Sequence, residues 1–135
     1  MEQLVLESER ALTILIVEDD PANGALLSML IAQETAYNPL LVTTGEQAIE
    51  AVQQKRPDLF ILDYTLPHLN GLELYEQLHT ITDLEDVPAI LLSARNIADE
   101  IAPPLIFFAK PYNIDELIAL IKTLLSPTDE IPLCV

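Results

Sequence analysis

The sequence is poor in positively charged residues and in cysteine, and each shortage narrows the functions open to it. Six lysines and arginines stand against 22 aspartates and glutamates, which gives a net charge of -16. Binding to a nucleic-acid backbone depends chiefly on cationic side chains, so we expect no direct nucleic-acid ligand. The single cysteine, Cys134, cannot form a disulfide within the chain, and this favours a reducing, cytoplasmic compartment.

Glycine is also scarce, and long apolar runs are missing. The three glycines lie too far apart for a phosphate-binding loop or a dinucleotide fingerprint. The apolar segment 11–17 is far shorter than a membrane span and leads directly into three acidic residues, so we expect neither a signal peptide nor a membrane anchor. The chain has 135 residues, half of them hydrophobic, and this length predicts a single core.

What the sequence does contain is a regular alternation of two patterns. Short, almost entirely apolar runs are typical of parallel strands covered on both faces. There are five of these runs, at residues 13–17, 39–42, 59–62, 89–92 and 105–108. Between them, apolar residues recur at helical spacing. The predicted helices cover residues 21–33, 45–54, 71–80 and 114–125.

This alternation predicts an α/β fold of the flavodoxin-like, doubly wound kind. We expect five parallel strands in the order 2-1-3-4-5 with helices on both faces. The domain should cover residues 12–126, with terminal tails at 1–11 and 127–135. Asp20 should cap the helix that starts at Pro21. Two further helix starts have the spacing of capping boxes, namely Thr44 with Gln47 and Asn113 with Glu116.

Polar residues follow four of the predicted strands and should meet at one rim of the sheet. Glu18 and Asp19 follow the first strand, Asp63 the third, Ser93 the fourth and Lys110 the fifth. Three neighbouring carboxylates repel one another unless a divalent cation lies among them. Oxygen ligands in an incomplete cage suit Mg2+, which retains water and accepts phosphate oxygens. The rim therefore predicts a site for magnesium and a phosphoryl group.

The same residue types indicate what this site could do. A carboxylate whose charge is offset by a metal can attack phosphorus, and Asp63, in the middle of the acidic set, is the candidate nucleophile. Lys110 would offer a positive charge to the phosphoryl oxygens, and the Ser93 hydroxyl would offer a hydrogen-bond donor. Phosphoryl transfer depends mainly on positioning and charge neutralisation, and these side chains supply both.

Four segments in this order resemble the receiver domain of two-component response regulators. They are LIVEDDP at 15–21, LFILDYTLPHLNG at 59–71, ILLSA at 90–94 and FFAKPY at 107–112, and the resemblance extends over about residues 13–125. It implies that Asp63 is the phosphoacceptor, Asp19 a direct Mg2+ ligand and Glu18 its acidic neighbour. The backbone carbonyl of Thr65 would be a further metal ligand.

The resemblance also assigns the phosphate side of the site. Ser93 would be the switch hydroxyl, Lys110 the phosphate-binding lysine, and Phe107 the aromatic residue whose rotamer follows the hydroxyl. The bond from Lys110 to Pro111 is cis in the family, at the modest cost of an X-Pro bond. Phe107 can equally be an ordinary core aromatic, and this alternative stays open at this point.

The chain departs from the family pattern between Ser93 and Lys110. They are 17 positions apart, which is about one to one and a half helical turns fewer than the family usually allots. Residues 97–101 leave room for only a short turn, and Pro103 and Pro104 prevent its continuation. We therefore expect the fourth helix to be shortened or lost, which puts the family's usual output face in doubt.

The function expected from the sequence is that of a phosphoryl-accepting signalling domain. A sensor histidine kinase or phosphotransfer protein would phosphorylate Asp63, and output would be through contact with a downstream protein, because no output domain fits in the remaining length. A receiver-fold interaction module with weak or no response to phosphate is the alternative. An enzyme is not expected: haloacid-dehalogenase phosphatases carry a second acid two positions after the nucleophile, where this chain has Thr65.

Each of these residues also has a simpler interpretation. The acidic run at 18–20 can be a helix cap and solvated loop, Asp63 a turn residue, and Lys110 a surface lysine. These interpretations lose force because the residues occur together. His68 and His79 have no metal-ligand partners at suitable spacing, so we interpret both as surface residues.

Overall fold

The computed structural model describes residues 12–126 and contains one five-stranded parallel sheet in the order β2-β1-β3-β4-β5. This confirms the predicted flavodoxin-like topology. The strands are β1 (Thr13–Val17), β2 (Asn38–Val42), β3 (Leu59–Asp63), β4 (Ala89–Ser93) and β5 (Leu105–Ala109). The helices are α2 (Pro21–Glu34), α3 (Gly45–Gln54), α4 (Gly71–His79) and α5 (Ile114–Leu125). The tails predicted at 1–11 and 127–135 lie outside the described residues.

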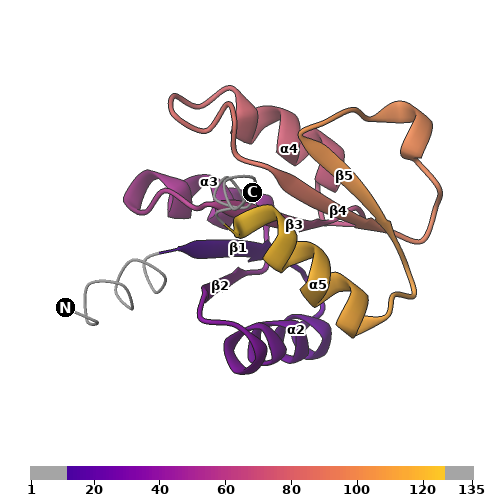
Figure 1. Cartoon of the computed structure of the whole chain (residues 1–135). Helices are drawn as coiled ribbons and strands as arrows, with labels where there is room; N and C mark the ends of the chain where they lie inside the picture. The colour runs from indigo at the N-terminus through magenta and orange to yellow at the C-terminus, as the bar shows by residue number, and fades with distance from the viewer. Residues whose placement is uncertain (1–11, 127–135) are drawn as a thin grey trace, which may run out of the picture.

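The helices cover the sheet on both sides, α2 and α5 on one face and α3 and α4 on the other (Figure 1). Every residue of β1, β3 and β4 is buried, which explains why these runs lack the alternation of a half-exposed strand. Each fully buried Leu, Ile or Phe contributes about 1.5–3 kcal/mol to folding. The two apolar layers thus hold the sheet in place, and the carboxyl ends of its strands form the rim on which the predicted site residues lie. Within residues 12–126, no helix is long and apolar enough to cross a membrane.

The helix starts follow the predicted capping residues, but both predicted capping boxes differ in detail. Asn113 accepts the N–H of Glu116, and the described residues show no return bond from the Glu116 side chain. The Thr44 side chain accepts the backbone N–H of Gln47, as predicted. The Gln47 side chain, however, accepts from the N–H and hydroxyl of Thr43, 2.8 and 3.0 Å away. A complete capping box forms instead at the start of α4, between Asn70 and Glu73. This box fixes the helix that follows the loop after β3.

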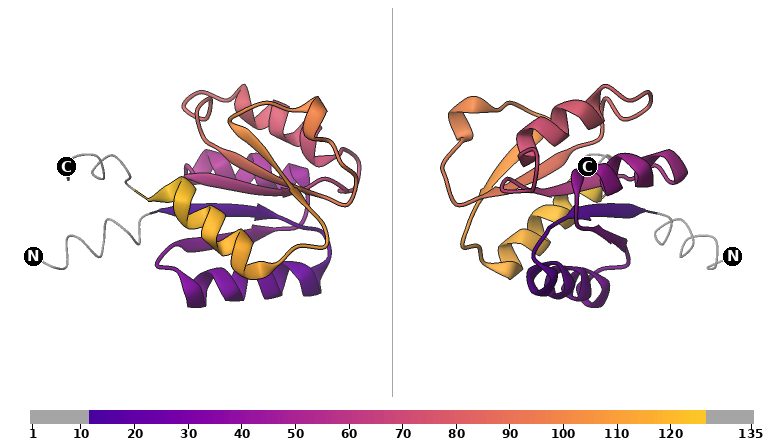
Figure 2. Two further views of the ribbon diagram at one scale, coloured as in Figure 1. Left: turned by 45° about the vertical axis from the view of Figure 1, so that its right-hand side comes forward. Right: turned by 180° about the vertical axis from the view of Figure 1, so that it is seen from behind.

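The connection between β4 and β5 contains only the three-residue 3-10 turn η1 (Ala98–Glu100). Figure 2 shows it as one short orange turn in a long loop. The predicted shortening is confirmed. Ile97 is buried in the apolar layer beneath the turn, while the bonds to Pro104 and Pro111 are both cis. The cis bond at Lys110-Pro111 is the one that the family resemblance implied.

Candidate functional site

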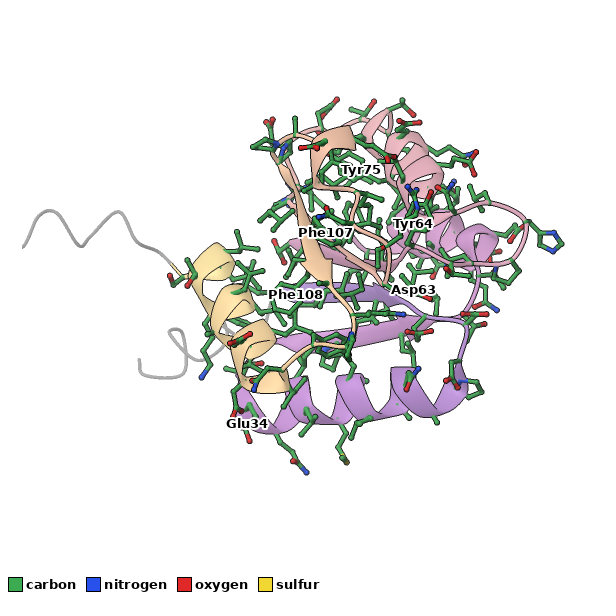
Figure 3. All side chains as sticks on the ribbon, turned by 90° about the vertical axis from the view of Figure 1, so that its right-hand side faces the viewer. Glu34, Asp63, Tyr64, Tyr75, Phe107 and Phe108 are labelled. Atoms are coloured by element: carbon green, nitrogen blue, oxygen red, sulfur yellow. The ribbon has the colours of Figure 1, made fainter. Side chains whose placement is uncertain are left out.

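Backbone hydrogen bonds continue the sheet one residue beyond several strands and so hold the rim in place. The N–H of Glu18 donates to Val42 O at 3.1 Å, and the N–H of Lys110 donates to Ser93 O at 2.9 Å. The residues that follow neighbouring strands are therefore held in place by backbone hydrogen bonds of the sheet. Figure 3 shows Asp63 at this end of the sheet.

The rim brings together the three carboxylates named from the sequence. Glu18 and Asp63 are almost fully buried, with 6% and 4% of their surfaces exposed, whereas Asp19 is exposed. One carboxylate oxygen from each of the three lies within 4.8 Å of the others. Adjacent parallel strands bring Glu18 and Asp63 side by side, because β1 pairs with β3.

Lys110 reaches this cluster from the loop after β5. Its Nζ atom donates to Oδ1 of Asp63 at 2.5 Å, and the lysine side chain is 28% exposed. The positive charge thus offsets one of three negative charges and leaves the cluster with a net negative charge. A site of this composition attracts a divalent cation.

Burial and neighbouring charges shift the pKa values of these groups. Burial raises the pKa of Asp63, and the hydrogen bond and positive charge of Lys110 partly counter it. Burial likewise raises the pKa of Glu18, with the negative charge of Asp63 adding to the effect. For Lys110, burial lowers the pKa, but the hydrogen bond and charge of Asp63 outweigh it, so the pKa is raised. Burial therefore disfavours the charged forms of Glu18 and Asp63, and a bound cation would favour them.

The other predicted site residues lie in three different environments. Ser93 is buried at the end of β4, with 2% of its surface exposed. Thr65 is exposed in the loop after β3. Phe107 is partly buried on β5 and packs in the same apolar layer as α3 and α4, where Figure 3 shows it on the Tyr64 side of the sheet. The roles of these residues stay predictions.

Two residues near the site escaped the sequence reasoning. Arg95 donates through Nη2 to the hydroxyl of Tyr64 at 2.8 Å, and its guanidinium carbon lies 5.1 Å from the centroid of the Tyr64 ring. The sequence holds a weak signal for both, because Tyr64 directly follows Asp63 and Arg95 is a rare cation two residues after Ser93. Their contact joins the loops after β3 and β4.

One of the two histidines differs from the surface position expected for it. His68 is exposed, with a positive φ of 73°. His79, in the last turn of α4, instead lies 4.4 Å from Tyr75 between ring centroids, and its Nε2 is 3.2 Å from the Tyr75 hydroxyl. The contact follows from the helical i, i+4 spacing.

The donor set at the rim fits one class of metal. Three carboxylates offer oxygen ligands, and among the described residues this is the cluster of His, Cys, Asp and Glu that is close enough to hold an ion. Magnesium prefers such oxygen ligands, together with water and phosphate. The partial burial of the cluster and its excess of negative charge both agree with this choice.

The comparison with protein families decides the identity of the fold. Residues 14–122 match the family model described as the response regulator receiver domain. The chain belongs to this receiver family of two-component signalling. It is 35% identical over 118 residues to the transcriptional regulatory protein BaeR of Escherichia coli, covering 83% of this chain and 47% of BaeR. It is also 35% identical over 120 residues to the response regulator MprA of Mycobacterium leprae, covering 85% of this chain and 51% of MprA.

Solved receiver structures superpose on this chain. The signal receiver domain of a signal transduction histidine kinase from Syntrophus aciditrophicus has a TM-score of 0.75 and 33% identity, covering 84% of this chain and 89% of that one. The receiver domain of the sensor histidine kinase PA1611 from Pseudomonas aeruginosa has a TM-score of 0.73 and 25% identity, covering 84% and 96%. That receiver domain is described with a magnesium ion coordinated in its active-site cleft.

The length of the relatives bears on the partners expected from the sequence. The chain spans about half the length of the curated relatives it matches. One of them, MtrA of Mycolicibacterium smegmatis, is described as a DNA-binding response regulator. The expectation that this protein has no direct nucleic-acid partner is therefore not supported by its relatives.

Proposed function

We propose that residues 12–126 form a receiver domain that accepts a phosphoryl group on Asp63 in a Mg2+-dependent reaction. The observation that carries this proposal is the cluster of Glu18, Asp19 and Asp63 within 4.8 Å, with Lys110 bonded to Asp63. The donor would be a phosphohistidine on a sensor histidine kinase or phosphotransfer protein. Output would be through contact with a downstream protein.

The chemistry assigns one task to each side chain. An Asp63 oxygen attacks phosphorus, an oxygen–phosphorus bond forms, and the bond from phosphorus to the donor's imidazole nitrogen breaks. Asp19, Glu18, Asp63 and the Thr65 carbonyl would hold Mg2+ directly or through water. Bound Mg2+ would neutralise charge on the carboxylates and the phosphoryl oxygens.

Lys110, Ser93 and Phe107 would act on the phosphorylated side of the site. Lys110 is bonded to Asp63 now, and its ammonium group would turn to a phosphoryl oxygen once Asp63 is modified. The Ser93 hydroxyl would donate to a second phosphoryl oxygen, and Phe107 would follow its movement. The positions of Ser93 and Phe107 on neighbouring strands β4 and β5 support this pairing.

A groove beside the rim supports the proposed type of donor. It measures about 570 Å3, and its lining includes Leu26 and Leu30 of α2, Tyr112, and the charged residues Glu18 and Lys110. Leu26 is 53% exposed, so an apolar side chain of a partner could bury it. A partner docked on the groove would place its phosphorylated residue near Asp63.

Incubation with acetyl phosphate and Mg2+, followed by intact-mass measurement, tests the proposal. The wild type should gain the mass of one phosphoryl group, and EDTA should abolish the gain. Asp63→Asn should gain nothing, while Asp86→Asn, a matched change at an exposed loop aspartate, should behave like the wild type. Phosphorylation of Asp63→Asn at the wild-type level would refute the assignment of Asp63.

The shortened connection between β4 and β5 favours a second candidate function. Only the three residues of η1 are helical between β4 and β5, so the fourth-helix part of the family's usual output face is reduced. A receiver-fold interaction module that responds weakly or not at all to phosphate would fit this feature. Absence of any mass gain in the same experiment, with the fold intact, would favour the module over the phosphoryl acceptor.

A further inference from the structure

The Ser93 hydroxyl is bound on both sides by the backbone of Arg95. Its hydrogen is donated to the Arg95 carbonyl at 2.8 Å, and its oxygen accepts the Arg95 N–H at 3.0 Å. A serine hydroxyl carries only one hydrogen. It therefore cannot donate to Arg95 and to a phosphoryl oxygen at the same time.

The side chain of Arg95 fixes that backbone from the outside. One guanidinium nitrogen, Nη2, donates to the Tyr64 hydroxyl at 2.8 Å, and the other, Nη1, donates to Glu100 Oε2 at 3.1 Å. The planar guanidinium is suited to two partners in fixed directions, which a lysine could not serve equally well. We call Tyr64, Arg95 and Glu100 the Arg95 latch.

The latch ties together three parts of the chain that meet at the site. Tyr64 directly follows Asp63, and a backbone hydrogen bond of 2.8 Å to Leu92 anchors its N–H to β4. Glu100 belongs to η1, the short turn that stands where a longer helix was expected. The side chains of Arg95 and Glu100 are about half exposed, so the latch can open without disturbing the core.

We propose that Arg95 is a positioning residue for the phosphoryl-transfer site. The latch keeps the Arg95 backbone in the position in which it is hydrogen-bonded to the Ser93 hydroxyl. It thereby opposes rotation of the Ser93 side chain towards a phosphoryl group on Asp63. This inference rests on the proposed function, because it concerns the response to a phosphoryl group. A weaker latch makes the phosphorylated conformation easier to reach.

Titration with beryllofluoride, a phosphoryl mimic, in the presence of Mg2+ measures this effect. Glu100→Gln removes one arm of the latch and leaves Arg95 in place. It should bind beryllofluoride about two- to fivefold more tightly than the wild type, the range typical of losing one exposed ion pair. Asp99→Asn removes the same charge from the same turn but is not an ion-pair partner of Arg95 in the part of the chain that the structure describes. This control should match the wild type.

A second background tests whether the effect passes through Ser93. In Ser93→Ala the hydroxyl is absent, so adding Glu100→Gln should change beryllofluoride affinity no further. Arg95→Lys, which keeps the charge but loses the two-armed geometry, should resemble Glu100→Gln when Ser93 is present. If Glu100→Gln has its full effect without the Ser93 hydroxyl, Arg95 acts on the phosphoryl group directly and the inference is overturned.

The same titration distinguishes failure of the proposed latch from failure of the proposed function. Wild-type protein that binds beryllofluoride, combined with equal affinities for Glu100→Gln and Asp99→Asn, overturns the latch alone. Wild-type protein that neither binds beryllofluoride nor accepts a phosphoryl group refutes the proposed function and the latch with it. Tighter binding in Glu100→Gln that depends on Ser93 supports both.

Discussion

At the scale of single residues, the contact between Lys110 and Asp63 affects both the cost of burying Asp63 and the binding of a cation to it. Asp63 is buried, and its bond to Lys110 offsets part of the penalty of burying a carboxylate. A cation that binds Asp63 must therefore share or displace this bond. Metal binding and lysine pairing at Asp63 compete with each other.

Lys110→Ala should separate the two roles. Without the ammonium group, Mg2+ no longer competes for Asp63, so we expect its affinity to rise severalfold while phosphorylation by acetyl phosphate falls. The variant should melt at a lower temperature in EDTA, because Asp63 is left buried without its partner, and should recover in Mg2+. Lys122→Ala, at an exposed position of α5, is the matched control. Loss of Mg2+ affinity in Lys110→Ala would show that the lysine holds the carboxylates together.

Glu18 gives a prediction with a defined pH dependence. Its pKa is raised in the folded protein, so between the unfolded and folded pKa values the folded state binds more protons than the unfolded state. Stability is then lost as the pH rises through this window. In EDTA at pH 7, Glu18→Gln should therefore raise the melting temperature by a few degrees. The gain should disappear below about pH 4, where the carboxyl is protonated in both states.

Exposed Glu50→Gln on α3 is the control for loss of one negative charge from the whole chain. A gain in melting temperature for Glu18→Gln that persists at low pH, or that Glu50→Gln reproduces, would contradict the explanation by local burial.

The sequence placed the charged residues of the site correctly because they follow apolar runs, and parallel strands present their carboxyl ends at one edge. Glu18, Asp63 and Lys110 could be brought together by this rule alone. The partner of Arg95 could not be predicted in the same way. Tyr64 and Arg95 are 31 positions apart, and their contact depends on the path of two loops that no periodic pattern describes.

At the scale of elements, the start of α4 is adapted to the strand that carries Asp63. Gly71 is the first residue of α4, and a Cβ atom there would lie 2.4 Å from the carbonyl oxygen of Asp63 and 2.7 Å from a methyl group of Leu91. The backbone oxygen cannot move away without displacing β3. Glycine at this position thus allows α4 to approach the site closely.

Gly71→Ala should therefore destabilise the fold by about 1–3 kcal/mol, as overpacking of a tight core contact does. Urea unfolding measures the change in the free energy of unfolding. The affinity for Mg2+ should fall as well, because the added methyl group would displace the backbone of Asp63. Gly24→Ala is a suitable comparison, since its Cβ would meet side chains and no backbone: that of Leu41 at 3.0 Å, and that of Glu18 at 3.5 Å, an ordinary van der Waals distance. Equal losses in the two variants would indicate that helix packing in general, and not the approach to Asp63, explains the glycine.

Element boundaries were predictable to about one residue, because strand runs and helical spacing are local signals. The connection between β4 and β5 was predicted as a shortened helix from its length and from Pro103 and Pro104. What this shortening does to the neighbouring loops was not predictable, since the ion pair from η1 to Arg95 depends on tertiary contacts. The capping box at Asn70 and Glu73 has a local signature and was simply not singled out.

At the scale of the whole molecule, charge is distributed unevenly over the surface. The net charge of the chain is -16, yet α2 carries no charged residue before Glu34 at its end. Leu26 and Met29 on this helix are 53% and 48% exposed. This helix therefore forms an uncharged surface patch beside the site on an otherwise acidic molecule. We expect acidic partner proteins to meet less electrostatic repulsion there than elsewhere on the surface.

The overall charge also requires care in interpreting magnesium as a stabiliser, because any cation reduces repulsion in such an acidic chain. Binding at the rim should add about 1.4 kcal/mol of stability at ten times the dissociation constant, or about 4–7 °C in melting temperature. Sodium chloride at equal ionic strength should give a smaller rise. Asp19→Asn should lose the excess over sodium chloride, whereas Asp86→Asn, at an exposed loop position, should keep it. If magnesium stabilises Asp19→Asn as much as the wild type, its effect is screening of the whole molecule, and the three carboxylates do not form a specific site.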